Sequence, residues 1–143
     1  MSRRPSPVLM TTPLVMAWGC AFTATHWPAP PSGGGAMPFP HADKLVHATI
    51  YALLAVTALA AVTAWQIPWS LKLGLAVGGT LTALGILDET TQLLVRGRSA
   101  DVMDWVADSV GAFLGIGLYA AGRTWILPKQ PHAATETAPQ EIR

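Results

Sequence analysis

Acidic, basic and amide side chains interrupt stretches of this sequence that are otherwise apolar enough to lie in a lipid bilayer. An ionisable group at membrane depth is costly, so it usually has a partner, faces the protein interior and marks a functional site. We therefore treat these side chains as the candidates for chemistry. They form three groups along the chain: Asp43, Lys44 and His47, then Asp88, Glu89 and Gln92, and then Arg98, Asp101, Asp104 and Asp108.

The combination of one imidazole with several carboxylates is typical of acid–base chemistry, because histidine changes its charge near neutral pH. We accordingly assign candidate catalytic roles to His47, Asp88 and Asp104. Carboxylates also bind Mg²⁺, Ca²⁺ or Mn²⁺, and the imidazole leaves Zn²⁺ open, so a divalent metal is a candidate cofactor of undetermined identity. The other candidates are assigned to ligand binding, with the two cations holding a phosphate or carboxylate: Lys44, Glu89, Gln92, Arg98, Asp101 and Asp108.

The elements that must position these groups are four apolar segments, each long enough to cross a membrane. A helix needs about 20 apolar residues to span about 30 Å of hydrocarbon. The composition agrees, since 51% of the residues are apolar and only 12% are charged, against about 25% in soluble domains. The sequence predicts an all-α, polytopic membrane protein whose small bundle contains helices over residues 8–27, 44–65, 71–94 and 101–124.

Polar stretches between the spans predict the remaining organisation. Residues 28–42 contain five prolines and three consecutive glycines, so we expect a loop there. Residues 95–100 predict a tight turn. We expect a cytoplasmic N-terminus, one transmembrane domain and a disordered tail, at residues 1–7, 8–127 and 128–143 respectively.

Flanking charges predict the orientation of the bundle. Four spans place both termini on one side, where five basic residues flank the helices, against three on the other side. The positive-inside rule then favours cytoplasmic termini. A secretory signal peptide is the rival interpretation of the first span, because Arg3 and Arg4 precede an apolar core. No clear small-residue cleavage site supports that rival before Trp27.

Helical spacing predicts that the polar groups converge. Residues at i, i+3, i+4 and i+7 share a helix face, and at about 1.5 Å per residue the three groups lie at similar depth. We therefore expect a funnel that opens to the outside. Asp88 and Glu89 are about 100° apart around their helix, so one should face the funnel and the other a neighbouring helix. One stripe follows the rule throughout: Asp101, Asp104, Asp108, Gly111 and Gly115.

Small and aromatic residues predict packing and membrane contacts. Gly74-x-x-x-Gly78 and Gly111-x-x-x-Gly115 provide faces for close helix approach. Tyr51 and the tryptophans are expected to lie at the membrane interface.

The three polar motifs also carry a family resemblance. Asp43-Lys44-x-x-His47, Asp88-Glu89-x-x-Gln92 and Arg98-x-x-Asp101-x-x-Asp104, followed by Gly111 and Gly115, resemble the VanZ-like family of bacterial membrane proteins over about residues 43–118. Asp108 departs from an expected asparagine, and Arg96-Gly97 departs from a frequent proline before glycine. The resemblance implies a link to the cell envelope, since the family's namesake is associated with low-level resistance to the glycopeptide teicoplanin. It implies no established reaction.

Three functional hypotheses stay open. In the first, the outer funnel binds, or also modifies, a membrane lipid or a cell-wall precursor headgroup, so enzymatic activity is undecided. In the alternative, the chain is a non-enzymatic accessory or scaffold protein whose polar cluster is structural. The third is a small proton-coupled transporter, which four spans would form only as an oligomer. A net charge of +1 gives no reason to expect a nucleic-acid partner.

Overall fold

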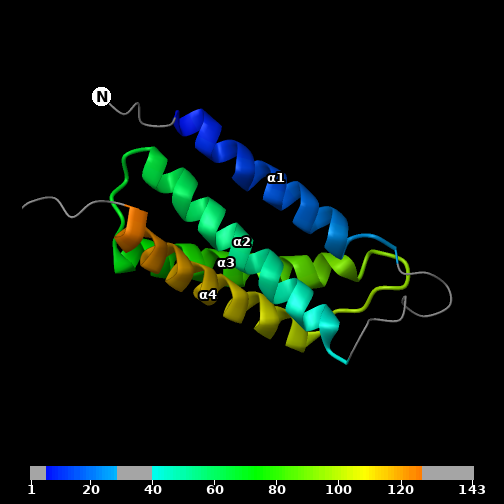
Figure 1. Ribbon diagram of the computed structural model, residues 1–143. Coiled ribbons are helices and arrows are strands. Elements are labelled where there is room, and N and C mark those ends of the chain that lie inside the picture. The colour runs from blue at the N-terminus through cyan, green and yellow to red at the C-terminus, as the bar shows by residue number, and fades with distance from the viewer. Residues whose placement is uncertain (1–5, 29–39, 127–143) are drawn as a thin grey trace, which may run out of the picture.

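The computed structural model describes residues 6–28 and 40–126, and within these ranges the chain forms four long α-helices (Figure 1). All four are long and apolar enough to cross a membrane. The prediction of an all-α bundle of four spans is therefore confirmed. The helices are α1 (Pro7–Thr25), α2 (Ala42–Ala64), α3 (Leu71–Gln92) and α4 (Val102–Ile126), each within two residues of its predicted bounds.

Local sequence signals explain where these helices begin and end. The Ser70 hydroxyl accepts a hydrogen bond from the Leu73 amide at 3.1 Å, which satisfies one of the free donors at the start of α3. Gly97 has a φ of 79° in the turn between α3 and α4, a conformation that suits glycine. The predicted tail at residues 128–143 and most of the predicted loop lie outside the described residues.

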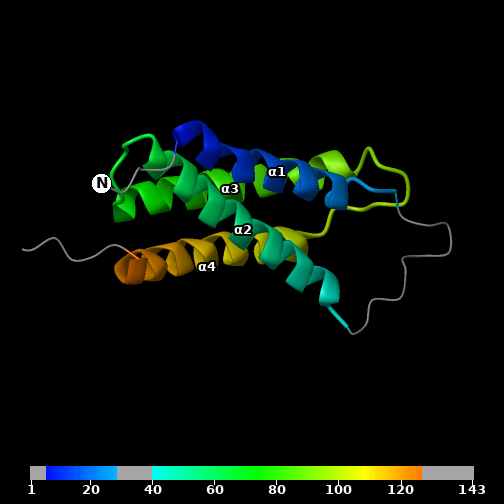
Figure 2. The same ribbon diagram turned by 45° about the horizontal axis from the view of Figure 1, so that its top comes forward.

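The helices run back and forth, so that four helix termini gather at one end of the bundle. Figures 1 and 2 both place the end of α1, the start of α2, the end of α3 and the start of α4 at the right. The α2–α3 turn, the start of α1 and the end of α4 lie at the left. All the polar groups singled out in the sequence therefore belong to one end. Large apolar side chains such as Leu53, Leu75 and Leu114 are exposed on the flanks, as a bilayer requires.

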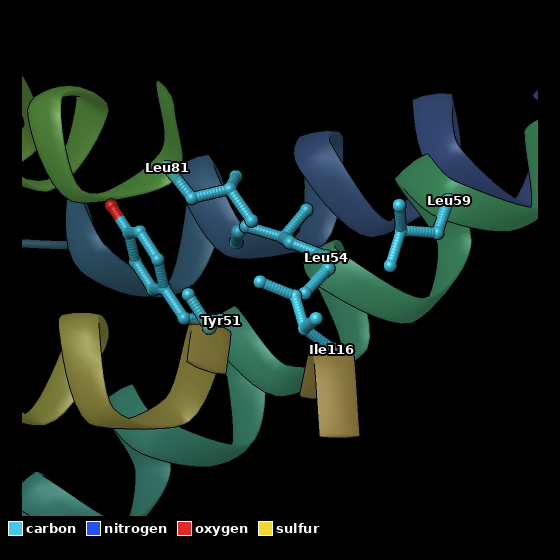
Figure 3. Close-up of a cluster of buried hydrophobic side chains, with 8 residues drawn as sticks. Tyr51, Leu54, Leu59, Leu81 and Ile116 are labelled. Atoms are coloured by element: carbon cyan, nitrogen blue, oxygen red, sulfur yellow. The ribbon is translucent and has the colours of Figure 1, made fainter. Parts of the chain in front are cut away.

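A compact apolar cluster forms the centre of the bundle (Figure 3). Leu54 and Leu59 of α2 are fully buried, and Leu81 and Ile116 join them from α3 and α4. Tyr51 belongs to this cluster as well, and its hydroxyl points toward α3. The expectation that Tyr51 anchors the membrane interface is therefore wrong: it sits one turn below His47 on the buried face of α2.

Two tryptophans also turn inward. The Trp105 indole N–H donates to the Thr82 carbonyl oxygen at 3.0 Å, and Trp69 packs against Tyr119 with ring centroids 5.6 Å apart. The indole N–H of Trp105 thus has a hydrogen-bond partner inside the bundle and does not need one from water or headgroups at the membrane surface.

The tightest contact in the bundle is between α2 and α4, and glycines make it possible. A β-carbon on Gly111 would overlap the backbone carbonyl of Ala48, and one on Gly115 would overlap that of Ala52. On α3, a β-carbon at Gly78 would lie 2.8 Å from the Phe113 ring. The small-residue faces predicted from the sequence are therefore packing surfaces, and α2 and α4 touch backbone to backbone.

We predict that Gly111→Ala destabilises the protein by about 1–3 kcal/mol, because the new methyl group meets a backbone carbonyl that cannot rotate away. Gly117→Ala is the matched control, since it lies in the same helix with open space around it. The free energy of unfolding of each purified variant in detergent gives the two stabilities. Equal stability of the two variants would contradict the packing described here.

Candidate functional site

Lys44 lies at the centre of the most solvent-accessible part of the polar end. Its ammonium nitrogen is 2.9 Å from Asp43 Oδ2 and 2.7 Å from Asp104 Oδ1, and it donates a hydrogen bond to Asp101 Oδ2. Lys44 is in the first turn of α2, whereas Asp101 and Asp104 stand at the start of α4. One cation therefore joins two helix ends and offsets the repulsion among three carboxylates.

Asp101 lies just before α4, outside the membrane-spanning segments. The hydrogen bond from Lys44 holds the pKa of this carboxyl below its ordinary value, and the backbone amide of Met103, which donates to Asp101 Oδ1 at 2.8 Å, adds to the effect. Asp101 is therefore a carboxylate at neutral pH.

His47 and Asp108 form a buried pair beneath the Lys44 cluster. His47 Nδ1 lies 2.9 Å from Asp108 Oδ1, and Asp108 is fully buried between the helices. The second oxygen of Asp108 has no hydrogen-bond partner among the described residues and faces Gly85, where a β-carbon would lie 3.3 Å away. On its other side, His47 Nε2 is 3.9 Å from Asp104 Oδ2. The imidazole is thus held between two carboxylates.

Glu89 of α3 extends toward the residues around Lys44 and His47. It is buried, and its Oε2 accepts a hydrogen bond from the Asp101 backbone amide at 2.7 Å. The Gln92 side-chain amide donates to Glu89 Oε1 and to Asp88 Oδ2, each at 3.1 Å. Gln92 therefore bridges two neighbouring carboxylates of α3, and Glu89 is the one that turns toward α2 and α4.

Asp88 instead faces α1. Its Oδ1 accepts a hydrogen bond from the Thr25 hydroxyl at 3.0 Å and lies 3.7 Å from His26 Nδ1. His26 Nε2 is 2.9 Å from the Thr91 hydroxyl, which completes a link between the ends of α1 and α3. The sequence interpretation missed Thr25 and His26. The available signal was a hydroxyl and an imidazole at the end of the first apolar span, at the depth of the other polar groups.

Arg98 does not join the carboxylates. Its guanidinium donates to the carbonyl oxygens of Ala24 and Trp27, each at 3.1 Å, and it forms no ion pair with any residue described in the structure. The last carbonyls of a helix lack partners within it and carry the negative end of its dipole, so they attract a cation. The expected counter-ion role of Arg98 is replaced by capping of α1.

The structure therefore separates the predicted site residues into two neighbouring networks that share Gln92. The first, which we call the α2–α4 cluster, contains Asp43, Lys44, His47, Glu89, Asp101, Asp104 and Asp108. The second contains Asp88 with Thr25, His26 and Thr91. The starts of α2 and α4 and the end of α3 meet in the α2–α4 cluster, whereas Asp88 and Arg98, which were expected there, face α1. The catalytic and binding roles stay predictions.

Among the described residues, two sets of side chains have ligand atoms close enough for a metal ion, within 4.8 Å of one another in each set. The first set contains an imidazole and two carboxylates, of which His47 and Glu89 are buried and Asp104 is partly buried. The second set is entirely acidic and partly buried, and consists of Asp43, Asp101 and Asp104.

A groove of about 280 Å³ leads to this cluster between α3 and α4. Its walls are mainly apolar, with Ile86 and Val102 exposed on the flank of the bundle and Trp105 behind them. Glu89 and Asp101 are also among its lining residues. The groove thus lies beside the carboxylates of the α2–α4 cluster.

A bundle of four membrane-spanning helices with an imidazole and carboxylates buried at one end defines a small multi-pass membrane protein with an intramembrane polar site. The chain belongs to the VanZ/LLP1 family, whose model matches residues 8–126. Neither the curated proteins nor the solved structures include a match to this chain.

We predict that Asp101 contributes to stability in a pH-dependent way. A carboxyl whose pKa is lowered by folding stabilises the protein above its ordinary pKa of 3.8, and this contribution is lost as the pH falls through the folded value. Wild type should therefore unfold at a higher temperature than Asp101→Asn near neutral pH. The difference should shrink below pH 3.8 in a thermal unfolding series. A difference that stays constant with pH would contradict the pairing with Lys44.

Proposed function

We propose that this VanZ/LLP1-family membrane protein binds the headgroup of a lipid-linked envelope molecule at the α2–α4 cluster. The observation that carries the proposal is the groove between α3 and α4, whose mainly apolar lining contains the exposed Ile86 and Val102 together with Glu89 and Asp101. A ligand with an apolar tail and a polar head can enter such a groove from within the bilayer. Ligand sites of this kind are mostly apolar with a few placed polar groups.

The charges at the polar end favour a headgroup that donates hydrogen bonds. Lys44 already contacts three carboxylates, and Arg98 is bound to the end of α1, so neither cation is free to hold an anionic group. Ionised carboxylates accept hydrogen bonds only. Sugar hydroxyls or an amino group therefore match these carboxylates better than the phosphate or carboxylate expected from the sequence.

His47 gives the site a capacity for proton transfer. Asp108 holds its Nδ1, and its Nε2 faces Asp104. A carboxylate that orients an imidazole in this way is the usual arrangement of a general base. We propose His47 and Asp104 as the groups that would act on a bound headgroup. Asp88 is bonded to Thr25 and Gln92, faces α1 and has no part in the chemistry proposed here.

The proposal includes an orientation and an envelope role. With both termini in the cytoplasm of a bacterial cell, as the flanking charges favour, the cluster faces the outer leaflet of the inner membrane. That orientation is tested by replacing Ser99 with cysteine and labelling intact cells with a membrane-impermeant thiol reagent, which should react with it.

A headgroup site in the outer leaflet is in reach of cell-wall precursors, which supports a link to teicoplanin susceptibility. Comparing that susceptibility in cells with and without the chain measures the link.

A second candidate function is a scaffold in which the polar residues only hold helices together. The observation that favours it is the second network, in which Asp88, Thr25 and His26 hold α1 against α3, together with the hydrogen bonds of Arg98 to the end of α1. In that case, conservative changes should lower stability and leave ligand binding and cellular phenotype unchanged.

We predict that a diacylglycerol carrying an amino-sugar headgroup stabilises the purified protein in nanodiscs, whereas the same lipid without the sugar does not. Glu89→Gln should abolish this selective rise in unfolding temperature, because it removes a carboxylate that lines the groove. Asp88→Asn is the matched control, since it makes the same change of charge on the next residue of α3, which faces α1. Equal stabilisation by both lipids, or equal loss in both variants, would contradict the proposed site.

A further inference from the structure

We propose that His47, Glu89 and Asp104 bind a divalent transition-metal ion between α2, α3 and α4. A ring nitrogen of His47 and one carboxylate oxygen of each acid lie within 4.8 Å of one another. Ligands about 2.1 Å from a common ion lie about 3–4 Å apart, so shifts of about 1 Å complete the site. Each ligand comes from a different helix, and His47 and Glu89 are buried.

His47 is oriented as a metal ligand usually is. A histidine that binds a metal through one nitrogen commonly donates the N–H of the other to a carboxylate. Here Asp108 Oδ1 occupies that position, 2.9 Å from Nδ1, and the tautomer with its proton on Nδ1 offers the lone pair of Nε2 to a metal ion. The side chain is more than nine-tenths buried, and Nε2 makes no hydrogen bond with any residue that the structure describes. Its carboxylate neighbour, Asp104 Oδ2, is 3.9 Å away, beyond hydrogen-bond distance.

A positive charge between His47 Nε2 and the carboxylate oxygens that face it stabilises this arrangement, and either a proton on the imidazole or a metal ion supplies that charge. Lys44 does not supply it, because its ammonium contacts Asp43, Asp101 and the other oxygen of Asp104. Lys44 already occupies the space among the oxygens of the second acidic set, so no metal is proposed there. Glu89 already accepts two hydrogen bonds, so the atoms of the first set that make none with the described residues are His47 Nε2 and Asp104 Oδ2, and a divalent ion would bind both.

The donor set defines the class of ion. One imidazole with two carboxylates suits Mn²⁺ or Zn²⁺, whereas Mg²⁺ and Ca²⁺ prefer oxygen ligands alone. Three protein ligands leave coordination positions open to water or to an oxygen of a ligand. The ion would occupy Nε2 of His47 beside the groove, so the proton-transfer role proposed above for His47 belongs to the metal-free protein, and binding of the ion does not depend on binding of a headgroup.

The test is metal binding by the purified full-length protein in detergent without added lipid. After removal of adventitious metal, titration calorimetry with Mn²⁺ and with Zn²⁺ should show one saturable site per chain, and excess Mg²⁺ should not displace either ion. His47→Gln, Glu89→Gln and Asp104→Asn should each weaken binding at least about tenfold. Asp108→Asn should weaken it about 10- to 100-fold, as expected for a carboxylate that orients the histidine. Asp88→Asn, the matched control on the other network, should bind as wild type does.

The spectrum of bound Mn²⁺ keeps the proposal testable if a variant folds poorly. Electron paramagnetic resonance of the wild-type protein should reveal coupling to an imidazole nitrogen, and His47→Gln should remove it. Absence of a saturable site, displacement by Mg²⁺, a spectrum without nitrogen coupling, or equal weakening in Asp88→Asn would each overturn the proposal. Because no lipid is present, such a failure would leave headgroup binding to be judged by its own experiment.

Discussion

The backbone contact between α2 and α4 is the constraint on which the rest of the structure depends. Gly111 and Gly115 let α4 press against the carbonyls of Ala48 and Ala52. Ala48 directly follows His47, and Gly111 lies one turn after Asp108, so the same approach brings the imidazole and the carboxylate to 2.9 Å. The helix packing and the pairing of His47 with Asp108 therefore depend on the same close approach of α2 and α4. A larger residue at either glycine would separate the helices and the paired side chains together.

Burial of charge explains why the polar end is so densely connected. An unsatisfied polar group inside a protein costs about 1–3 kcal/mol, and more when it is charged. Lys44 joins the starts of α2 and α4, Gln92 joins two acids of α3, and Arg98 caps α1. Each bond lowers that cost, and the bonds of Lys44 and Arg98 also hold segments of different helices together. His47 Nε2 and Asp104 Oδ2 make no such bond with the described residues, and the inferred metal ion is placed between them.

The spans and the shared depth of the polar groups could be predicted from the sequence, because length, hydropathy and helical periodicity determine both. The stripe from Asp104 to Gly111 follows from spacing alone. Periodicity does not determine how α1 docks, so the bonds of Asp88 to Thr25 and of Arg98 to Ala24 were not foreseen. Tyr51 was misplaced because an aromatic ring with a hydroxyl suits both a membrane interface and a buried site beside polar groups.

The most direct test of the account is a double-mutant cycle between α2 and α4. Free energies of unfolding would be measured in detergent for wild type, His47→Ala, Asp108→Ala and the double variant. Side chains in contact should show a coupling energy of about 0.5–3 kcal/mol, which is the result expected here. Additive effects, with a coupling energy near zero, would show that the two helices do not bring these side chains together and would contradict the site built on them.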